Sequence, residues 1–321
     1  MKHSLRSIAV AVVALGVAGC GADRPDAAGG TPTAATTSAT TSATTATPLT
    51  MASSTSRPTG AATTVVPAVP KRIVSLSPTA TETLFAIGAG PQVVAVDDQS
   101  NFPAEAPRTD LSGFRPNVEA IAAKNPDLVV IADDSAKLGD ALGKLKIPVL
   151  VQPPAKRIED VYAQIGELGS RTGRRAQAEA LTTKMKADLA AIVAGAPKPA
   201  KPLRYYHELD DTYYTVTSTT FAGQIYRLFG LSSIADAADD GSGYPQLSAE
   251  AILTADPDVI FLADTKCCKQ SARTVAARPG WSTLKAVKAN AVVELDDDLA
   301  SRWGPRVVEF ARAVAAGLAR S

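Results

Sequence analysis

The sequence predicts an α/β fold made of two similar lobes with largely parallel sheets, joined by one long rigid helix. Short apolar runs that fit buried strands alternate with segments of helical periodicity on short connections, a pattern typical of parallel α/β sheets. One stretch of sequence recurs at a constant spacing, which indicates that the lobe is repeated. A helical segment long enough to join the two copies lies between them.

The first lobe begins where the periodicity begins, at Arg72. Residues 73–76 form a short apolar run that fits a strand, and the Ser-Pro-Thr run at 77–79 fits a turn. We expect the next helix to stop at Gly88, and a later one to stop ahead of Pro126. The expected elements are strands at 73–76, 93–96 and 128–131 and helices at 81–87 and 118–123.

A second copy of this pattern follows along the chain. Residues 117–130 pair without a gap with residues 248–261, so every match lies 131 residues apart, including Glu with Glu and Pro-Asp with Pro-Asp. The strand, turn and helix at 73–88 have a looser echo at 213–230. A single repeat of this length is too long for a solenoid unit and therefore predicts two similar lobes.

The segment at 158–193 is expected to form a helix, a break at Gly173 and a long helix of about twenty residues, because apolar residues recur there at helical spacing. Three prolines between 197 and 202 end it. The expected division is a first lobe at 71–172, an interlobe helix at 173–199 and a second lobe at 200–321. A ligand would lie in the cleft between the lobes.

Residues 1–20 have the features of a targeting signal. Lys2 and Arg6 supply positive charge, and residues 8–17 form an apolar run too short to span a bilayer. The run leads to Val-Ala-Gly and Cys20, which resembles the bacterial lipobox, so Cys20 is expected to be lipidated and to anchor the chain at the extracytoplasmic face of the cell membrane. An ordinary secretory signal with an accidental cysteine is the alternative. Residues 21–70, rich in Ala, Thr, Ser and Pro, are expected to be a disordered tether.

Composition argues against several classes of protein. A net charge of +1 gives no general attraction to nucleic acid. Loss of the leader removes His3 and leaves His207 as the one histidine, which disfavours a carrier of free Zn²⁺ or Mn²⁺. The sequence has no Gly-x-Ser-x-Gly elbow and no P-loop, and its Gly88-Ala89-Gly90 follows a helix rather than a strand. We therefore expect no enzyme, no metal centre and no cofactor.

Four segments carry a resemblance to a known family. They are residues 72–82, 113–130, 245–262 and 277–281, and together they resemble the iron-siderophore and cobalamin class of periplasmic binding proteins from Arg72 to the C-terminus. The resemblance implies a monomeric lipoprotein that delivers a metal chelate to an ABC permease dimer and its ATPase. Cobalamin, a ferric siderophore and haem all remain open as the chelate. The alternative is a lipoprotein that kept the fold as a partner-binding module.

The cleft should be lined by loops at the carboxyl ends of the strands. A large conjugated ligand is held there by aromatic faces and a few converging polar groups. Each candidate has a plainer alternative, which is core or surface packing for an aromatic and a solvated surface charge for the arginine. The expected ligand-binding residues are Ser77, Thr79, Phe114, Tyr244, Arg302 and Trp303.

Glu119 and Glu250 occupy equivalent positions in the repeat, one on each lobe. The resemblance implies that they dock onto arginines of the two permease subunits, and such charge pairs set orientation and association rate. The alternative is that each carboxylate only complements the dipole of its own short helix.

Cys267 and Cys268 follow the second-lobe strand expected at 259–263, in a compartment that is oxidising. We expect them to close a vicinal disulfide near the ligand, with a pair of free thiols as the alternative. A metal-dithiolate site is disfavoured because no histidine or third cysteine stands nearby.

Overall fold

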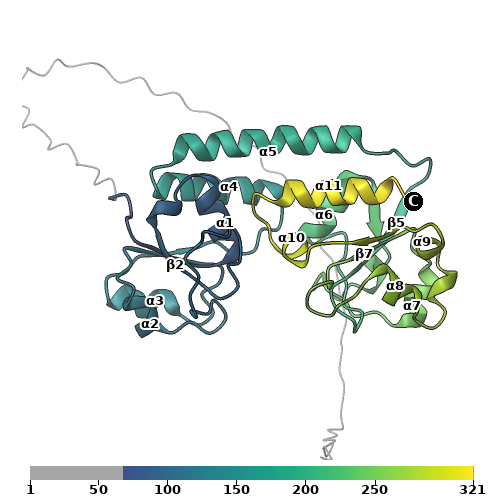
Figure 1. The fold of residues 1–321 in the computed structure, drawn as a ribbon, viewed down its shortest axis with the longest axis horizontal. Coiled ribbons are helices and arrows are strands. Elements are labelled where there is room, and N and C mark those ends of the chain that lie inside the picture. The colour runs from purple at the N-terminus through teal and green to yellow at the C-terminus, as the bar shows by residue number, and fades with distance from the viewer. Residues whose placement is uncertain (1–67, 321) are drawn as a thin grey trace, which may run out of the picture. The chain divides into compact units, whose positions relative to one another are not determined.

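The computed structural model describes residues 68–320, and the first lobe in it is a four-stranded parallel sheet flanked by helices (Figure 1). The strands lie in the order β2-β1-β3-β4, and the strands expected at 73–76, 93–96 and 128–131 are confirmed. The elements of this lobe are β1 (Ile73–Leu76), α1 (Pro78–Ala86), η1 (Gly90–Gln92), β2 (Val93–Val96), α2 (Val118–Ala122), β3 (Leu128–Ile131), α3 (Leu138–Lys144) and β4 (Val149–Val151).

The first helix starts earlier than expected. The run at 77–79 is not a separate turn but the start of α1, with Pro78 as the first helical residue. The Oγ atom of Ser77 accepts a hydrogen bond from the N–H of Ala80 at 3.3 Å, which satisfies a donor that the helix itself leaves unpaired. Proline suits the first helical position because its φ is already helical and it has no N–H to leave free.

The second lobe repeats the architecture of the first. Its four parallel strands lie in the order β6-β5-β7-β8, the same order as in the first sheet when the repeat is followed along the chain. The expectation of two similar lobes is therefore confirmed. The elements are β5 (Leu203–Glu208), α6 (Phe221–Leu228), β6 (Leu231–Ser233), η2 (Asp236–Ala238), α7 (Ala249–Ala255), β7 (Val259–Leu262), α8 (Ala272–Ala276), η3 (Trp281–Thr283), α9 (Lys285–Lys288) and β8 (Val292–Glu294).

The looser echo at 213–230 is right about its helix, α6, and wrong about its strand. β5 is the counterpart of β1, and it ends at Glu208. Tyr213 has a φ of 70°, and Tyr214 forms only an isolated antiparallel bridge with Gln246. The chain bends here because the Asp210 carboxylate accepts hydrogen bonds from Thr212, so the segment cannot extend into the sheet.

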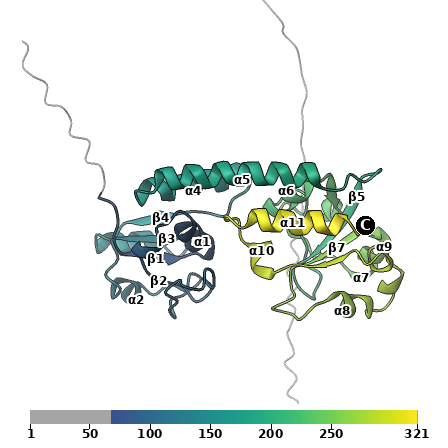
Figure 2. The ribbon, with the colours of Figure 1, turned by 45° about the horizontal axis from the view of Figure 1, so that its top comes forward.

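Helices α4 (Ile158–Arg171) and α5 (Arg175–Gly195) lie between the two sheets in the chain. The break between them falls where it was expected, at Gly173, whose φ of 71° glycine adopts without the steric cost of a Cβ atom. The 21 residues of α5 pack on α4 and on α11 (Val307–Leu318), which follows α10 (Asp297–Ser301). Figures 1 and 2 both show α5 running alongside these two helices.

Both sheets are covered on both faces, as parallel sheets generally are. Every residue of β1, β3 and β7 is buried. One face of the first sheet packs against α2 and α3, and the other joins a larger core with residues of α1, α4, α5, α6 and α11. Helices from both lobes thus share one core.

The leader at 1–20, including Cys20, lies outside the described residues, as does almost all of the tether expected at 21–70. Among residues 68–320, no helix combines the length and the apolar character needed to cross a bilayer.

Candidate ligand-binding cleft

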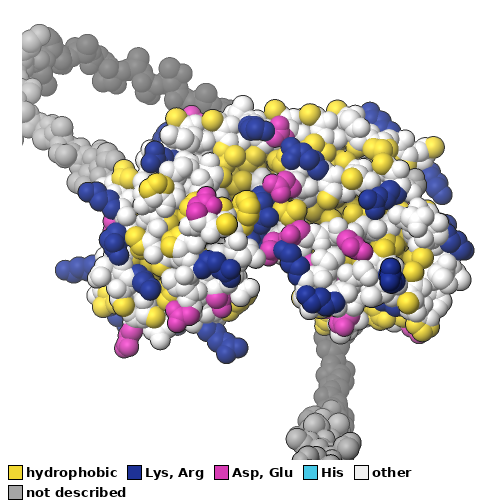
Figure 3. Space-filling model, viewed as in Figure 1, with side chains coloured by type: hydrophobic (Ala, Val, Ile, Leu, Met, Phe, Trp, Pro, Cys, Tyr) yellow, Lys and Arg dark blue, Asp and Glu magenta, His cyan; other side chains and the backbone are white. Residues whose placement is uncertain are grey.

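A cleft of about 600 Å³ opens where the carboxyl ends of the first-lobe strands face the segment at 298–303. Parallel strands end at the same edge of their sheet, so the loops after β1, β2 and β3 converge there. Figure 3 shows a notch between the two lobes in the lower half of the view. The lining residues are Leu76, Ser77, Pro78, Thr79, Asp97, Gln99, Gly113, Phe114, Pro116, Ala132, Asp133, Ser135, Ala136, Pro154, Asp298, Ser301, Arg302 and Trp303.

Five of the six expected ligand-binding residues line this cleft, and the sixth, Tyr244, does not. Phe114 is 85% exposed, and Tyr244, in the loop before α7, is 50% exposed. Neither ring packs in the core, so both rings are accessible to a molecule outside the chain.

The polar expected residues Ser77 and Thr79 are held by α1. Both are buried, and the Ser77 hydroxyl is occupied by the N–H of Ala80. The backbone carbonyl of Thr79 accepts a hydrogen bond from the hydroxyl of Thr83 at 2.9 Å.

Arg302 lines the cleft, but its guanidinium is occupied by the protein. Nη1 donates to Oε1 of Glu82 at 2.8 Å and to Oδ1 of Asn101 at 2.9 Å. Nη2 donates to the carbonyl of Gln99 at 3.0 Å and to Oδ1 of Asp298 at 2.8 Å. These bonds use all four Nη hydrogens, so Arg302 joins the second lobe to the first and has no Nη hydrogen left for an anionic ligand.

Glu82, on α1, also receives Arg306, which directly precedes α11. The Arg306 Nε donates to Oε2 at 2.8 Å, and its Nη2 donates to Oε1 at 2.5 Å, a bidentate arrangement. The Glu82 side chain is 1% exposed. The guanidinium of Arg306 also stacks over the ring of Phe102, with its central carbon 4.3 Å from the centroid. We call Glu82, Arg302 and Arg306 the interlobe clasp.

Two buried polar atoms of cleft residues have no hydrogen-bond partner. They are Oδ1 of Asp97, at the end of β2, and Nε1 of Trp303. Burial raises the pKa of Asp97, because desolvation penalises its charged form. Buried polar groups are nearly always paired, so these two atoms lack a partner that a ligand or water would supply.

The second lobe has its own buried polar cluster at the carboxyl ends of β5 and β7. Both carboxylate oxygens of Glu208 accept from Arg278, at 2.6 Å each. The neighbouring Asp264 is fully buried and neither of its carboxyl oxygens has a partner. Burial and the adjacent charge of Glu208 raise the pKa of Asp264 to about 8. None of these residues lines the cleft.

His207, the one histidine among residues 68–320, lies inside β5 and is fully buried. Its Nδ1 is 2.7 Å from the hydroxyl of Tyr226, and burial lowers its pKa to about 3. A neutral, enclosed ring cannot exchange protons with a substrate. No group of three or more His, Cys, Asp or Glu side chains able to hold a metal ion occurs in this part of the chain.

Cys267 and Cys268 lie in the loop after β7 with their Sγ atoms 2.8 Å apart, and the structure leaves both unbonded. The Asp297 carboxylate at the start of α10 holds this loop, accepting from the N–H groups of Lys266 and Cys267 at 3.0 Å each. Burial and the neighbouring Cys268 raise the pKa of Cys267 to about 12. The cysteines do not line the cleft, and the vicinal disulfide stays a prediction.

Glu119 and Glu250 occupy the first turns of α2 and α7 and are exposed. Each helix is capped by the residue before it: Asn117 Oδ1 accepts from Ala120, and Ser248 Oγ accepts in the matching way. The backbone N–H of Glu250 and the hydroxyl of Ser248 lower the pKa of Glu250. Neither carboxylate has an ion pair with another described residue, so both are available to a partner.

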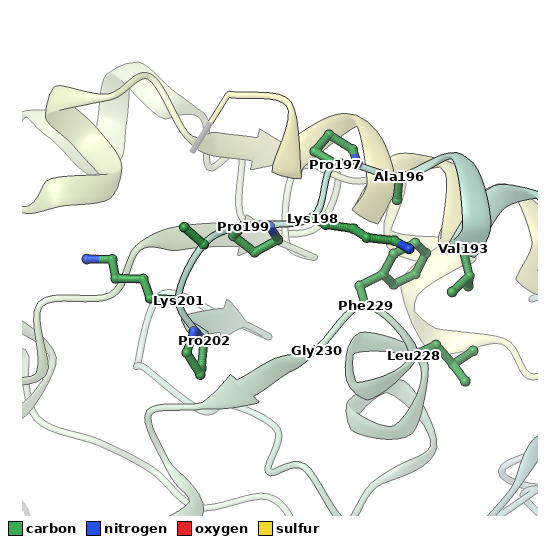
Figure 4. Close-up of a pocket in the computed structure, with 11 residues that line it drawn as sticks. Val193, Ala196, Pro197, Lys198, Pro199, Lys201, Pro202, Leu228, Phe229 and Gly230 are labelled. Atoms are coloured by element: carbon green, nitrogen blue, oxygen red, sulfur yellow. The ribbon is translucent and has the colours of Figure 1, made fainter.

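A second hollow, of about 420 Å³, lies beside the amino end of β5 in the second lobe (Figure 4). It is formed by the connection from the end of α5 to β5, at 196–202, and by the end of α6 near Phe229. The two lysines of this connection, Lys198 and Lys201, are its only charged lining residues within the described chain. Because it lies at the amino end of β5, away from the converging loops, it is not the candidate cleft.

Comparison with known proteins supports the fold and the family. Residues 73–299 match the family model described as periplasmic binding protein. The ABC transporter substrate-binding lipoprotein YvrC of Bacillus subtilis is 34% identical over 249 residues, covering 75% of this chain and 77% of YvrC. A cobalamin-binding protein of Halobacterium salinarum is 32% identical over 250 residues, covering 75% of this chain and 67% of that protein.

Among solved structures, the periplasmic vitamin B12 binding protein BtuF of Vibrio cholerae aligns with a TM-score of 0.62 and 25% identity, covering 78% of this chain and 97% of BtuF. The expected fold is therefore confirmed. The chain belongs to the periplasmic binding protein family and is a substrate-binding protein of the ABC-importer type.

Proposed function

We propose that this chain captures a metal chelate in the cleft between its lobes and delivers it to an ABC permease. One observation carries the proposal: the cleft of about 600 Å³ is lined from both lobes and contains unpartnered polar atoms beside the exposed ring of Phe114. This combination suits a large conjugated ligand with polar groups at its edge. The cobalamin-binding and vitamin B12 binding relatives favour a corrinoid, with haem and ferric siderophores as the other candidates.

The proposal assigns the two lobes to 71–172 and 200–321, with 173–199 as the helix between them, and keeps the chain at the outer face of the membrane through Cys20. Glu119 and Glu250 would dock on the permease dimer, since both are exposed, have no ion pair with another described residue and lie on matching helices. Tyr244, exposed and outside the cleft lining, would reach the ligand only at the rim.

Binding is best measured through tryptophan fluorescence, because the chain has only two tryptophans. Trp303 lines the cleft, whereas Trp281 is 1% exposed in the core of the second lobe. We expect cyanocobalamin, haemin or a ferric siderophore to quench Trp303 with a Kd below about 10 μM, or roughly −7 kcal/mol. Trp303→Phe should remove most of the signal. Absence of saturable binding by every chelate would refute the proposal.

Docking is tested separately from binding. Neutralising both glutamates, by Glu119→Gln with Glu250→Gln, should reduce chelate uptake into vesicles that contain the permease and leave the Kd of the chelate unchanged, because neither side chain lines the cleft. Unchanged uptake would end the docking assignment and leave the binding assignment intact.

A further inference from the structure

We propose that the cleft selects chelates that carry hydrogen-bond donors and no net negative charge, and that Asp97 is the residue that determines this specificity. The inference rests on the proposed function, a chelate bound in this cleft, and names the class of chelate. It follows from the polar groups of the cleft wall and from what each of them already bonds.

Within the cleft lining, one carboxyl oxygen of Asp97, Oδ1, is the buried acceptor that lacks a hydrogen bond, while Ser100 interacts with the same carboxyl group. Asp97 is 2% exposed, it lines the cleft, and its Oδ1 has no hydrogen bond in the described structure. Its backbone is fixed, because its N–H donates to the carbonyl of Ser75 at 3.1 Å. A buried carboxyl oxygen with a free lone pair favours a ligand that brings an N–H or O–H group to it.

Gly113 leaves room for the Asp97 carboxyl. A Cβ atom at this position would lie 2.6 Å from the carbonyl oxygen of Leu76 and 2.9 Å from Oδ2 of Asp97, closer than real contacts allow. Any other residue would therefore push the carboxyl or the backbone of β1 aside. The loop that carries the exposed Phe114 thus approaches Asp97 closely only because it passes through a glycine.

The charges of the cleft are unfavourable to an anion. Three of its lining residues are acidic, Asp97, Asp133 and Asp298, and Arg302 is the one basic residue in the lining within the described chain. All four Nη hydrogens of Arg302 are bonded inside the protein. Asp298 is paired with Lys266 and with Arg302 at 2.8 Å each, so Asp97 and Asp133 are the lining carboxylates that have no ion pair with another described residue. An anionic chelate would meet these two carboxylates with no Nη hydrogen of Arg302 available to it, and such like charges disfavour binding.

The second unpartnered atom points to the same class of ligand. Nε1 of Trp303 is a donor that needs an acceptor, while Oδ1 of Asp97 is an acceptor that needs a donor. A primary carboxamide offers both an N–H donor and a C=O acceptor, whereas a carboxylate offers acceptors only. A neutral chelate with carboxamides at its periphery, as in a corrinoid, satisfies both atoms. Haem with its two carboxylates, or a ferric tris-catecholate, can accept a hydrogen bond from Nε1 of Trp303 but is repelled by the carboxylate of Asp97.

The test compares cyanocobalamin and haemin on the purified full-length protein by equilibrium titration at low and high salt. We expect cyanocobalamin to bind at least about tenfold more tightly, the equivalent of roughly 1.4 kcal/mol. Asp97→Asn should narrow this ratio by about tenfold, because it removes the charge that repels the carboxylates. Asp98→Asn is the matched control: Asp98 is adjacent, exposed and outside the cleft lining, and its replacement should leave the ratio unchanged.

Tighter binding of haemin by the unaltered protein, or an unchanged ratio in Asp97→Asn, would overturn the inference and leave the proposed function standing. Failure of both chelates and of a cationic ferric hydroxamate to bind would instead overturn the proposed function. If Asp97→Asn does not fold, Asp133→Asn replaces it, because Asp133 is exposed in the same lining. Its effect should have the same direction and shrink at high salt, and an absent effect counts against the inference.

Discussion

Replacing Glu82 by glutamine should destabilise the protein by about 3 kcal/mol, at the lower end of the cost of breaking a buried ion pair. The carboxylate is 1% exposed and faces two guanidiniums whose side chains are 9% and 15% exposed, those of Arg302 and Arg306. Glutamine keeps the size and one acceptor oxygen, but it leaves two buried cations without their shared anion. Arg302 retains Asp298 as a partner, which is why the lower end of the range applies.

The assay is urea unfolding followed by circular dichroism. With a urea dependence of about 3 kcal/mol per molar, the midpoint should fall by about 1 M. Glu105→Gln is the control, because Glu105 is an exposed first-lobe carboxylate and its replacement should cost less than about 0.5 kcal/mol. If the two variants unfold at the same urea concentration, the clasp does not stabilise the fold and our account of Arg302 is wrong.

Three further outcomes concern groups outside the clasp. The raised pKa of Asp264 means that its contribution to stability is present at low pH and is lost as the pH rises from about 4 to about 8, at up to about 1.4 kcal/mol per pH unit. Asp264→Asn should therefore reduce the dependence of the unfolding free energy on pH, measured by urea unfolding. An unchanged pH dependence would contradict the assignment. The lowered pKa of His207 acts in the opposite direction, so stability is lost as the pH falls from about 6.5 to about 3, and His207→Gln should lessen this acid loss. Mass spectrometry of unreduced, alkylated protein should find Cys267 and Cys268 joined, two mass units lighter than the thiols and unlabelled; two alkyl labels would end the disulfide prediction.

The sequence predicted best where burial leaves a periodic pattern. The strands at 73–76 and 128–131 are short apolar runs buried on both faces, and the interlobe helices follow stripes such as Val161, Ile165 and Leu168. It failed where hydrogen bonding to a side chain overrides periodicity, as in the capped start of α1 at Ser77 and the bend after Asp210. β4 and β8, of three residues each, are too short to leave a pattern.

The cleft was predictable as a set of loops but not as a set of bonds. A parallel sheet places its carboxyl-end loops together whatever their side chains, so Phe114 and Trp303 could be assigned to one cleft from topology alone. Asp97, in a loop expected to line the cleft, was not among the expected ligand-binding residues, because nothing local in the sequence marks a carboxyl oxygen that is buried without a partner. Pairing between Arg302 and Glu82 spans 220 residues, and no sequence pattern marks it.

The clasp joins the same two walls that line the cleft. Glu82 lies on α1, whose first turn contributes Ser77 and Thr79 to the lining, and Arg302 lies in the second-lobe segment that contributes Trp303. Gly304 lies close enough to Thr79 that an added Cβ would be only 3.5 Å from its methyl group. The spacing of the cleft walls is therefore fixed from two sides, by α5 packing on α4 and α11 and by buried charges beside the cleft itself. Arg302, which the sequence predicted as a ligand contact, thus also shapes the cleft by holding the lobes together. In the proposed function, Phe114, Asp97 and Trp303 would provide contacts to the ligand.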